Sequence, residues 1–310
     1  MSPSREPTHP PHPVRRAGTL HRPGAVAAPR PGRHRFLEWD DYRVDREWKR
    51  YEGTPLRDLY RELRERFLAR HRPSRPGRSL EVGPGPGRFT RLIGHAQDRV
   101  ALLELSRAML DRLQEATSPR DSARVDLVQG DAVAPPFRAG RFDRVALLGN
   151  VVGFAEQDAP ELLARTCTLV APRGILLLEF VAGPGERSRY LHRLPPGAIA
   201  RLLAAPVRAV QPRVEREEFD RVRERETGAR HFRRFAPTDI VRRLEAEGFG
   251  IREVVAVAPC LGNDASRLSV VRTAPLAWNH LLELEEAIGR TPRRQANAAA
   301  ILVAAERLRS

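Results

Sequence analysis

Cysteine is nearly absent from this chain of 310 residues, and its two cysteines, Cys167 and Cys260, lie far apart. They form no C-x-x-C pair, which excludes a disulfide scaffold and the spacing of a zinc ribbon or a thioredoxin-type redox site. Long hydrophobic runs are also missing, because the stretch from Ile175 to Leu178 ends at Glu179, far short of the roughly 20 residues that span a bilayer. No apolar segment follows the N-terminal arginines, so the sequence predicts no secretory signal. We therefore expect a cytoplasmic protein with no membrane-spanning helix and no metal site.

Lysine occurs once, at Lys49, although lysine and arginine together number 54 and the formal net charge is +15. This preference points to genome-wide base composition, although arginine also suits the binding of phosphate and carboxylate groups. The excess is concentrated in residues 1–35, with seven arginines and one acid, and in residues 185–245, with fifteen arginines and nine acids. Two interpretations stay open: a solvated charged surface, which we favour, or a surface that attracts polyanions such as nucleic acid.

The N-terminal part of the chain divides into two segments. Residues 1–35 contain eight prolines and no apolar periodicity, so we predict a disordered tail rich in Pro and Arg. Residues 36–75 are expected to form a helical cap, because apolar side chains recur there at three- and four-residue steps: Leu56, Leu59, Tyr60, Leu63, Phe67 and Leu68. An aromatic group precedes them, either as packing of that cap or as a lid over a ligand: Trp39, Tyr42, Trp48 and Tyr51.

Residues 76–310 alternate short apolar runs with helical patterns, which is typical of a parallel sheet covered by helices on both faces. Strands are expected near 78–82, 99–104, 124–129, 142–148, 174–181, 251–258 and 299–305, and helices at 106–115, 159–170, 237–247 and 276–289. Thr238 is expected to cap the third of these helices and Gly248 to end it. An arginine-rich segment at about 185–235 interrupts the alternation, and its weakly alternating runs around residues 226–228 predict an inserted hairpin that serves as a substrate lid.

The most informative stretch is the glycine-rich turn at Gly83, Gly85 and Gly87, which directly follows the strand at 78–82. Glycine has no Cβ, so a ligand can lie against the backbone of such a turn, and a helix is expected to follow it. The spacing G-x-G-x-G differs from the G-x-G-x-x-G of dinucleotide sites, and the absence of a lysine after the glycines excludes a phosphate-binding loop. A purely structural turn is the alternative interpretation.

Acidic residues follow the next two strands. Glu104 closes the strand at 99–104, where a carboxylate can accept hydrogen bonds from two ribose hydroxyls; the alternative is an acid at a helix N-terminus. Asp131 follows the strand at 124–129, where it can accept a hydrogen bond from an adenine amine or serve as an ordinary turn residue. The carboxyl ends of parallel strands open at one edge of a sheet, so the glycine turn and these two acids are expected to lie together.

These features stand in the order and spacing of a known family. The matching phrases are Glu81-Val82-Gly83-Pro84-Gly85-Pro86-Gly87, Glu104-Leu105-Ser106-Arg107-Ala108-Met109-Leu110, Gly130-Asp131-Ala132 with Pro136-Phe137, Arg141-Phe142-Asp143-Arg144-Val145 with Leu148-Gly149-Asn150, Leu169 to Ile175, and Phe235 to Phe249. On these phrases the chain resembles the class I S-adenosylmethionine-dependent methyltransferases over roughly residues 40–310.

The resemblance implies an α/β fold with a Rossmann-like, seven-stranded, mostly parallel sheet whose last strand is antiparallel, and S-adenosylmethionine as the cofactor. The glycine turn would flank the methionine part, Glu104 would hold the ribose, Asp131 with Ala132 the adenine, and Glu81 would lie near the amino group. Acids suit the sulfonium and ammonium charges of this donor, which carries no phosphate. The implied donor-binding set is Glu81, Gly83, Pro84, Gly85, Gly87, Glu104, Leu105, Asp131, Ala132 and Leu148.

The resemblance also implies the reaction, in which an acceptor lone pair displaces the sulfonium methyl in line and much of the catalysis is positioning. No catalytic residue is assigned; acceptor-side candidates are Asn150, Tyr190, His192, His231 and Arg234. The phrase Leu148-Gly149-Asn150 is more similar to small-molecule N-methylating relatives than to the N-P-P-[YF] branches. We therefore predict methyl transfer to an N or O atom of a small molecule by a monomer or homodimer. The alternatives are an RNA methyltransferase that uses the basic tail and insert, and a donor-binding module without turnover.

Overall fold

The computed structural model describes most of the chain after residue 52. The described residues are 44, 45, 47, 53–117, 124–183, 185–221, 232–257, 260–261, 264–296 and 298–308. The predicted tail at 1–35 lies outside the described residues, and so do His231 and the aromatic group of Trp39, Tyr42, Trp48 and Tyr51. The domain division, the tail and the lid therefore stay predictions.

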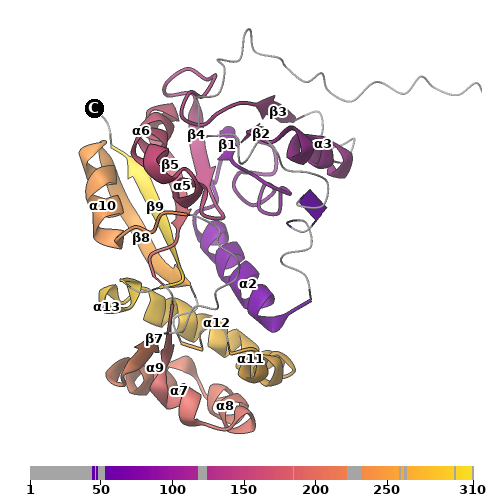
Figure 1. Ribbon diagram of the computed structural model, residues 1–310. Helices are drawn as coiled ribbons and strands as arrows, with labels where there is room; N and C mark the ends of the chain where they lie inside the picture. Colours follow the sequence, from indigo (N-terminus) through magenta and orange to yellow (C-terminus); the bar gives the residue numbers. More distant parts are fainter. Residues whose placement is uncertain are drawn as a thin grey trace, which may run out of the picture.

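A seven-stranded sheet forms the centre of the protein (Figure 1). Its strand order is β3-β2-β1-β4-β5-β9-β8, and all its strands are parallel except β9, which runs antiparallel to β5 and β8. The strands are β1 (Arg78–Val82), β2 (Arg99–Glu104), β3 (Val125–Gln129), β4 (Phe142–Leu147), β5 (Val170–Phe180), β8 (Phe249–Val257) and β9 (Ala300–Arg307). The predicted fold class is confirmed, including the antiparallel last strand.

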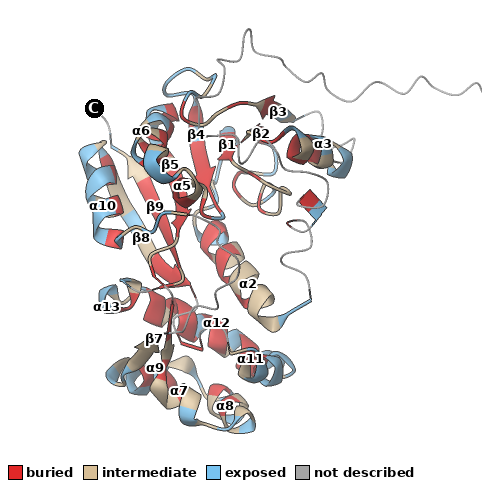
Figure 2. Ribbon diagram, viewed as in Figure 1, coloured by how far each residue is buried: buried red, intermediate tan, exposed pale blue. Residues whose placement is uncertain are grey.

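Helices cover both faces of this sheet. Alternate strand residues form two buried clusters, because successive side chains of a strand point to opposite faces. One cluster includes residues of α2 (Pro55–Arg70), α3 (Arg107–Ala116) and α12 (Pro275–Gly289), and the other includes residues of α6 (Ala159–Leu169) and α10 (Pro237–Ala246). Figure 2 shows the central strands and the inner sides of these helices as buried, with the outer sides of α6 and α10 exposed.

Helix α2 is the periodic part of the predicted cap. It begins at Pro55, after Thr54, whose hydroxyl accepts a hydrogen bond from the backbone N–H of Arg57 at 3.4 Å. Its buried side faces the sheet with the residues that the periodicity singled out, Leu59, Leu63, Phe67 and Leu68. Residues 44, 45 and 47 are also helical.

The prediction of a helix after the glycine turn is wrong. Residues 83–98, all of them described, connect β1 to β2 through a series of turns. Pro84 and Pro86 have no backbone N–H to donate, and the three glycines adopt positive φ angles of 63°, 53° and 71°. A right-handed helix is incompatible with this backbone at residues 83–87, and residues 88–98 continue to β2 in turns and bends.

The inserted segment is mainly helical. Its elements are β6 (Glu186–Ser188), α7 (Arg189–Arg193), α8 (Pro196–Leu203), α9 (Val207–Arg216) and β7 (Phe219–Arg221), with β6 antiparallel to β7. In α9 the buried residues Val210 and Val214 lie four positions apart, which is a helical spacing. The predicted hairpin, which was placed around residues 226–228, lies outside the described residues and stays a prediction. In Figure 1 these helices form a lobe below the sheet with α11 (Ala265–Arg272) and α12.

The boundaries of α10 correct one prediction and confirm another. Ala236 occupies the N-cap position and Pro237 the first turn, so Thr238 is not the cap. Proline suits the first helical turn because its fixed φ is helical and its missing N–H needs no partner there. Gly248, with φ of 84°, ends the helix as expected.

The remaining short helices are α5 (Val151–Phe154), the 3₁₀ turn η2 (Glu156–Asp158) and α13 (Pro292–Gln295). Over the part of the chain that the structure describes, no helix combines the length and the apolar character needed to cross a membrane.

Candidate functional site

The carboxyl ends of four neighbouring strands bring distant sequence positions into one row. The parallel register pairs Glu81 with Leu102 and Ala146, and Leu147 with Leu178. If this register is continued two residues past Glu81 and its partners, one row of neighbouring residues results. Across β2, β1, β4 and β5 the row contains Glu104, Gly83, Leu148 and Glu179. The side chains of this row face the side of the sheet that α2 and α12 cover, because Leu148 packs in their cluster.

Of the three glycines in the turn, one has a backbone that a ligand could approach. A Cβ at Gly85 would meet no atom within 4 Å, so open space lies beside this residue. A Cβ at Gly83 or Gly87 would instead come within 2.7 Å of the side chain of Val151 or Leu113. Gly85 therefore faces the space that a ligand can occupy, whereas the other two glycines are required by their φ angles and by close packing.

Glu104 joins the end of β2 to this turn. Its Oε2 accepts a hydrogen bond from the backbone N–H of Gly85 at 3.3 Å, and its Oε1 accepts one from Ser106 N–H at 3.0 Å. Burial raises the pKa of Glu104, and the backbone hydrogen bonds act in the opposite direction. The backbone N–H of Leu105 also hydrogen-bonds this carboxylate. Two carboxylate oxygens offer about four lone-pair sites, so Glu104 can still accept a hydrogen bond from a hydroxyl of a ligand.

Glu81 lies deeper on the same side of the sheet and is only 2% exposed. The hydroxyl of Thr90, a residue that sequence reasoning missed, donates a hydrogen bond to its Oε2 at 2.5 Å. Burial raises the pKa of Glu81 to about 7; the hydrogen bond from Thr90 lowers it, and repulsion from Glu104 raises it. Among the described residues, no arginine or histidine pairs with either carboxylate.

Buried Glu81 and half-buried Glu104, which no cation among the described residues neutralises, fit a ligand that carries positive charge. Bringing a cation beside them relieves their mutual repulsion and favours the ionised form of both. S-adenosylmethionine, the predicted cofactor, carries a sulfonium and an ammonium group and no phosphate. The open backbone at Gly85, the remaining acceptor capacity of Glu104 and the negative charge of Glu81 therefore fit this donor.

Asp131 lies at the neighbouring strand end. The backbone N–H of Gly130 donates to the carbonyl oxygen of Glu104 at 3.0 Å, which holds the end of β3 against the end of β2. Asp131 Oδ1 accepts a hydrogen bond from Val133 N–H at 2.9 Å, so this residue does act within its turn. The predicted donor residues Pro84, Leu105 and Ala132 lie in the loops that follow β1, β2 and β3.

The loop after β4 contains the acceptor-side candidate Asn150. Gly149 and Asn150 have φ angles of 73° and 68°, so two consecutive residues are left-handed, which is costly for a residue other than glycine. Asn150 Oδ1 accepts a hydrogen bond from Val181 N–H at 3.2 Å, and Gly149 N–H donates to Glu179 Oε2 at 3.0 Å. Both bonds tie this turn to the end of β5.

Sequence reasoning missed the buried ion pair beside this turn. Arg64 of α2 donates from Nε to Glu179 Oε2 at 2.9 Å and from a second guanidinium nitrogen to Oε1. The two residues are only 5% and 3% exposed. The one available signal was an acid at the end of an otherwise apolar strand; its partner lies 115 positions away in the chain.

Tyr190 and His192, two further acceptor-side candidates, lie in the inserted lobe. The guanidinium of Arg213 lies 4.3 Å from the centre of the Tyr190 ring, and His192 Nδ1 lies 3.3 Å from Asp264 Oδ2. Within the described residues, neither side chain has a hydrogen bond or ion pair to the strand-end residues. The structure therefore places both against α9 and the start of α11.

Arg234 lies closer to the strand ends. It is exposed, and its guanidinium lies 5.3 Å from the centre of the Phe232 ring. The neighbouring residue Arg233 donates its backbone N–H to Gly153 O at 2.9 Å, so this segment runs beside α5, directly after the left-handed turn.

The two cysteines take no part in this site. Both are buried free thiols, and burial raises the pKa of each, for Cys167 to about 12. The described residues contain no group of three or more His, Cys, Asp or Glu side chains that could hold a metal ion.

Comparison with known proteins matches this geometry. Residues 80–174 match a family model described as a methyltransferase domain. A protein-L-isoaspartate O-methyltransferase of Bradyrhizobium sp. (strain ORS 278) is 32% identical over 100 residues, which are 32% of this chain and 43% of that protein. The ubiquinone/menaquinone biosynthesis C-methyltransferase UbiE of Methylobacterium nodulans is 32% identical over 131 residues, 39% of this chain and 50% of that protein. The chain thus spans about half the length of the curated relatives it matches.

Among solved structures, a chain in the complex between the Haloferax volcanii Trm112 methyltransferase activator and a methyltransferase has a similar fold. The TM-score is 0.51 at 14% identity, covering 86% of this chain and 96% of that chain. The matched residues 80–174 contain the glycine turn, Glu104, Asp131 and Asn150. The predicted family, the class I S-adenosylmethionine-dependent methyltransferases, and its cofactor are confirmed. The two curated relatives are named for transfer to different atoms.

Proposed function

We propose that the class I S-adenosylmethionine-dependent methyltransferase domain of this chain is a working enzyme that methylates an N or O atom of a small molecule. The observation that carries this proposal is the pair of carboxylates, buried Glu81 and half-buried Glu104, beside the open backbone of Gly85. A protein that had lost its donor would have no need to keep two carboxylates that no described cation neutralises at this edge, since burying a charge such as that of Glu81 without a partner costs stability.

The strand order sets how the donor would lie. Asp131 follows β3, Glu104 ends β2 and the glycine turn follows β1, so the sites proposed for adenine, ribose and methionine succeed one another across the sheet. The next strand along is β4, which makes the turn at Gly149 and Asn150 the neighbour of the reacting end. The acceptor would therefore lie over the ends of β4 and β5.

The donor, when bound, supplies a methyl group on a positively charged sulfur. The residues of this chain then orient it: Glu104 accepts from the ribose hydroxyls, and Glu81 faces the positive charge. The contribution of the protein to the rate would be alignment of the acceptor with the methyl group and exclusion of water, and no general base is assigned.

The helical lobe favours a small acceptor. Helices α7, α8, α9, α11 and α12 lie beyond the carboxyl ends of β5 and β8 (Figure 1). Helix α2 crosses the face of the sheet that α12 also covers. The inserted segment leaves the sheet directly after β5 and returns to it through Arg233 and Phe235, whose backbone N–H groups bond Gly153 O and Val181 O. We propose that this segment closes over a small molecule.

Two measurements test the proposed function. Titration calorimetry with S-adenosylmethionine and S-adenosylhomocysteine is expected to show saturable binding that Glu104→Ala weakens. Incubation with labelled donor and separate pools of small amines, phenols and carboxylates, with bulk RNA in parallel, is expected to label a small-molecule pool. No binding at millimolar donor contradicts the donor site. Labelling of RNA alone, with binding that falls steeply as salt rises, identifies an RNA methyltransferase instead.

A further inference from the structure

A carboxylate at the end of β5 connects the N-terminal helix to the turn where the acceptor is proposed to lie. Glu179 accepts two hydrogen bonds from Arg64 of α2 and one from Gly149 N–H, the last at 3.0 Å on the same Oε2 that Arg64 Nε approaches at 2.9 Å. Arg64 also donates to the carbonyl oxygen of Tyr60 at 2.8 Å, which fixes its guanidinium against its own helix. The chain of contacts from α2 to the β4 turn is therefore continuous.

The position of this contact relative to the donor follows from the sheet. Glu179 and Glu104 stand in one row on one face, with β1 and β4 between their strands. Three strand spacings separate their backbones by about 14 Å. Glu104 belongs to the ribose end of the proposed site, so Glu179 stands at its far, reacting end.

The turn that this contact holds needs external support. Gly149 and Asn150 are both left-handed, and such a conformation persists only where the surroundings fix it. Two of its hydrogen bonds go to the end of β5: Gly149 N–H donates to Glu179, and Asn150 Oδ1 accepts from Val181 N–H at 3.2 Å. Loss of the carboxylate would leave the Gly149 N–H without this acceptor.

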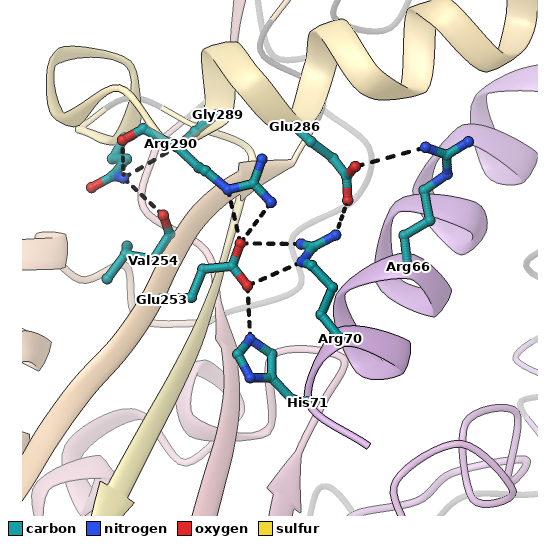
Figure 3. Close-up of polar contacts among 9 residues, drawn as sticks. Arg66, Arg70, His71, Glu253, Val254, Glu286, Gly289 and Arg290 are labelled. Carbon is teal, nitrogen blue, oxygen red and sulfur yellow. Dashed lines mark hydrogen bonds and ion pairs between the residues drawn. The ribbon is translucent and has the colours of Figure 1, made fainter. Parts of the chain in front are cut away.

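Helix α2 is itself fixed at its carboxyl end (Figure 3). Arg70 bonds Glu253 of β8 at 3.2 Å and also pairs with Glu286 of α12, while His71 Nε2 lies 2.7 Å from Glu253. Burial acts to raise the pKa of Glu253, but the contacts with His71, Arg70 and Arg290 outweigh it and lower the pKa to about 2. The helix is thus anchored to the sheet edge, and Arg64 is presented to Glu179 from a fixed support.

A purely structural role would not explain this choice of residues. Buried ion pairs carry a large desolvation cost, and apolar pairs of similar volume often replace them without loss of stability. An apolar pair could pack α2 on β5 equally well, but it could not accept the Gly149 N–H.

We propose that Arg64 and Glu179 are positioning residues of the acceptor side, which fix the left-handed Gly149–Asn150 turn through the Glu179 carboxylate. The N-terminal helix is then part of the active site rather than a detachable cap. The role in positioning an acceptor rests on the proposed function. The contact between α2 and the turn does not, because it is present in the structure.

The test replaces the ion pair by an apolar pair, Arg64→Met with Glu179→Leu, so that no uncompensated charge stays buried. Amide exchange followed by mass spectrometry reports on residues 149–155, and calorimetry reports S-adenosylhomocysteine binding. We expect exchange of the turn to rise about ten- to hundredfold, as for loss of a hydrogen bond to a charged group. S-adenosylhomocysteine affinity should stay within about twofold, and transfer to the labelled small-molecule pool should fall at least tenfold.

Two matched variants separate positioning from general damage. Arg61→Met lies on the same helix and removes half-buried ion pairs to Asp58, Glu62 and Glu65, none of which involves Glu179, so it should change neither exchange nor transfer. Glu179→Gln keeps an oxygen that can accept from Gly149 and should retain most of the protection of the turn.

Several outcomes overturn the proposal. They are unchanged exchange at 149–155 in the double variant, an equal rise in the distant strand β2, or unaltered transfer. If the wild-type chain binds neither donor nor product, the proposed function fails, and the exchange experiment still decides whether Glu179 holds the turn.

Discussion

Donor binding should depend on pH through Glu81. The pKa of this buried carboxyl is about 7 in the free protein, and a cationic donor beside it lowers that value. Binding below about pH 7 therefore releases a proton, so affinity rises as pH increases toward 7 and then levels off. A carboxyl with this pKa is roughly three-quarters ionised at pH 7.5 and roughly one-tenth ionised at pH 6. The dissociation constant should weaken roughly eightfold between these values, about 1.3 kcal/mol.

The assay is calorimetric titration of S-adenosylmethionine at pH 6.0 and 7.5, each in two buffers of different ionisation enthalpy. The buffer dependence of the heat counts the protons released. Glu81→Gln keeps the size of the side chain and an acceptor for the Thr90 hydroxyl but cannot ionise. This variant should bind more weakly than wild type at pH 7.5 and almost equally at pH 6.0.

A matched control comes from a second buried carboxyl with the same pKa. Burial raises the pKa of Glu285 in α12 to about 7, but its oxygens accept from Cys260 N–H and Leu261 N–H, away from the strand-end row. Glu285→Gln should leave the pH profile of donor binding unchanged. Equal wild-type affinity at both pH values, or the same pH dependence in Glu81→Gln, would refute the assignment of Glu81.

Three further predictions concern other groups of the protein. Glu104→Ala should weaken donor binding by roughly 1.5–3 kcal/mol in calorimetry and Glu104→Gln by less, whereas unchanged affinity in the alanine variant contradicts the ribose assignment. Glu285 keeps a proton in the folded state that the unfolded chain releases between pH 4.5 and about 7, so the free energy of unfolding should fall across that window by up to about 3 kcal/mol. Urea unfolding of Glu285→Gln should show a correspondingly smaller fall, and an identical pH dependence counts against the buried carboxyl. Replacing the exposed Arg233 and Arg234 by Ala should leave donor affinity within about 0.5 kcal/mol; reduced transfer would place them at the acceptor, and loss of the fold would make them structural.

The strands were predictable because each of them is a short apolar run, which is a local pattern of the sequence. The runs at 78–82 and 99–104 coincide with β1 and β2, and the expected order of parallel strands with an antiparallel last one is present. Local patterns failed where backbone chemistry or packing competed with them. Proline and left-handed glycine replaced the helix expected after β1, and the helical spacing of Val210 and Val214 went unrecognised among the many arginines of the insert.

The residues proposed to bind the donor were likewise predictable from the sequence. Glycine at a strand end and an acid at the end of the following strand are local features, and the parallel sheet brings them together at one edge by its own geometry. Glu104 and Gly85 are in fact bonded. Their roles toward a donor stay predictions, but their proximity follows from strand order alone.

The residues proposed to position the acceptor could be identified only from the tertiary structure. Arg64 and Glu179 meet across 115 positions. The spacing of Arg64 from Tyr60 and Leu68 places it on the buried face of α2, but no local pattern identifies Glu179 as its partner. Only the packing of α2 on the sheet brings Arg64 to Glu179, and that packing depends on anchors such as Glu253 and Glu286 in distant elements. Local sequence therefore determines which strand ends carry donor chemistry, because periodicity and turn chemistry act over a few residues. Which distant side chain neutralises a buried charge depends on the packing of the whole chain.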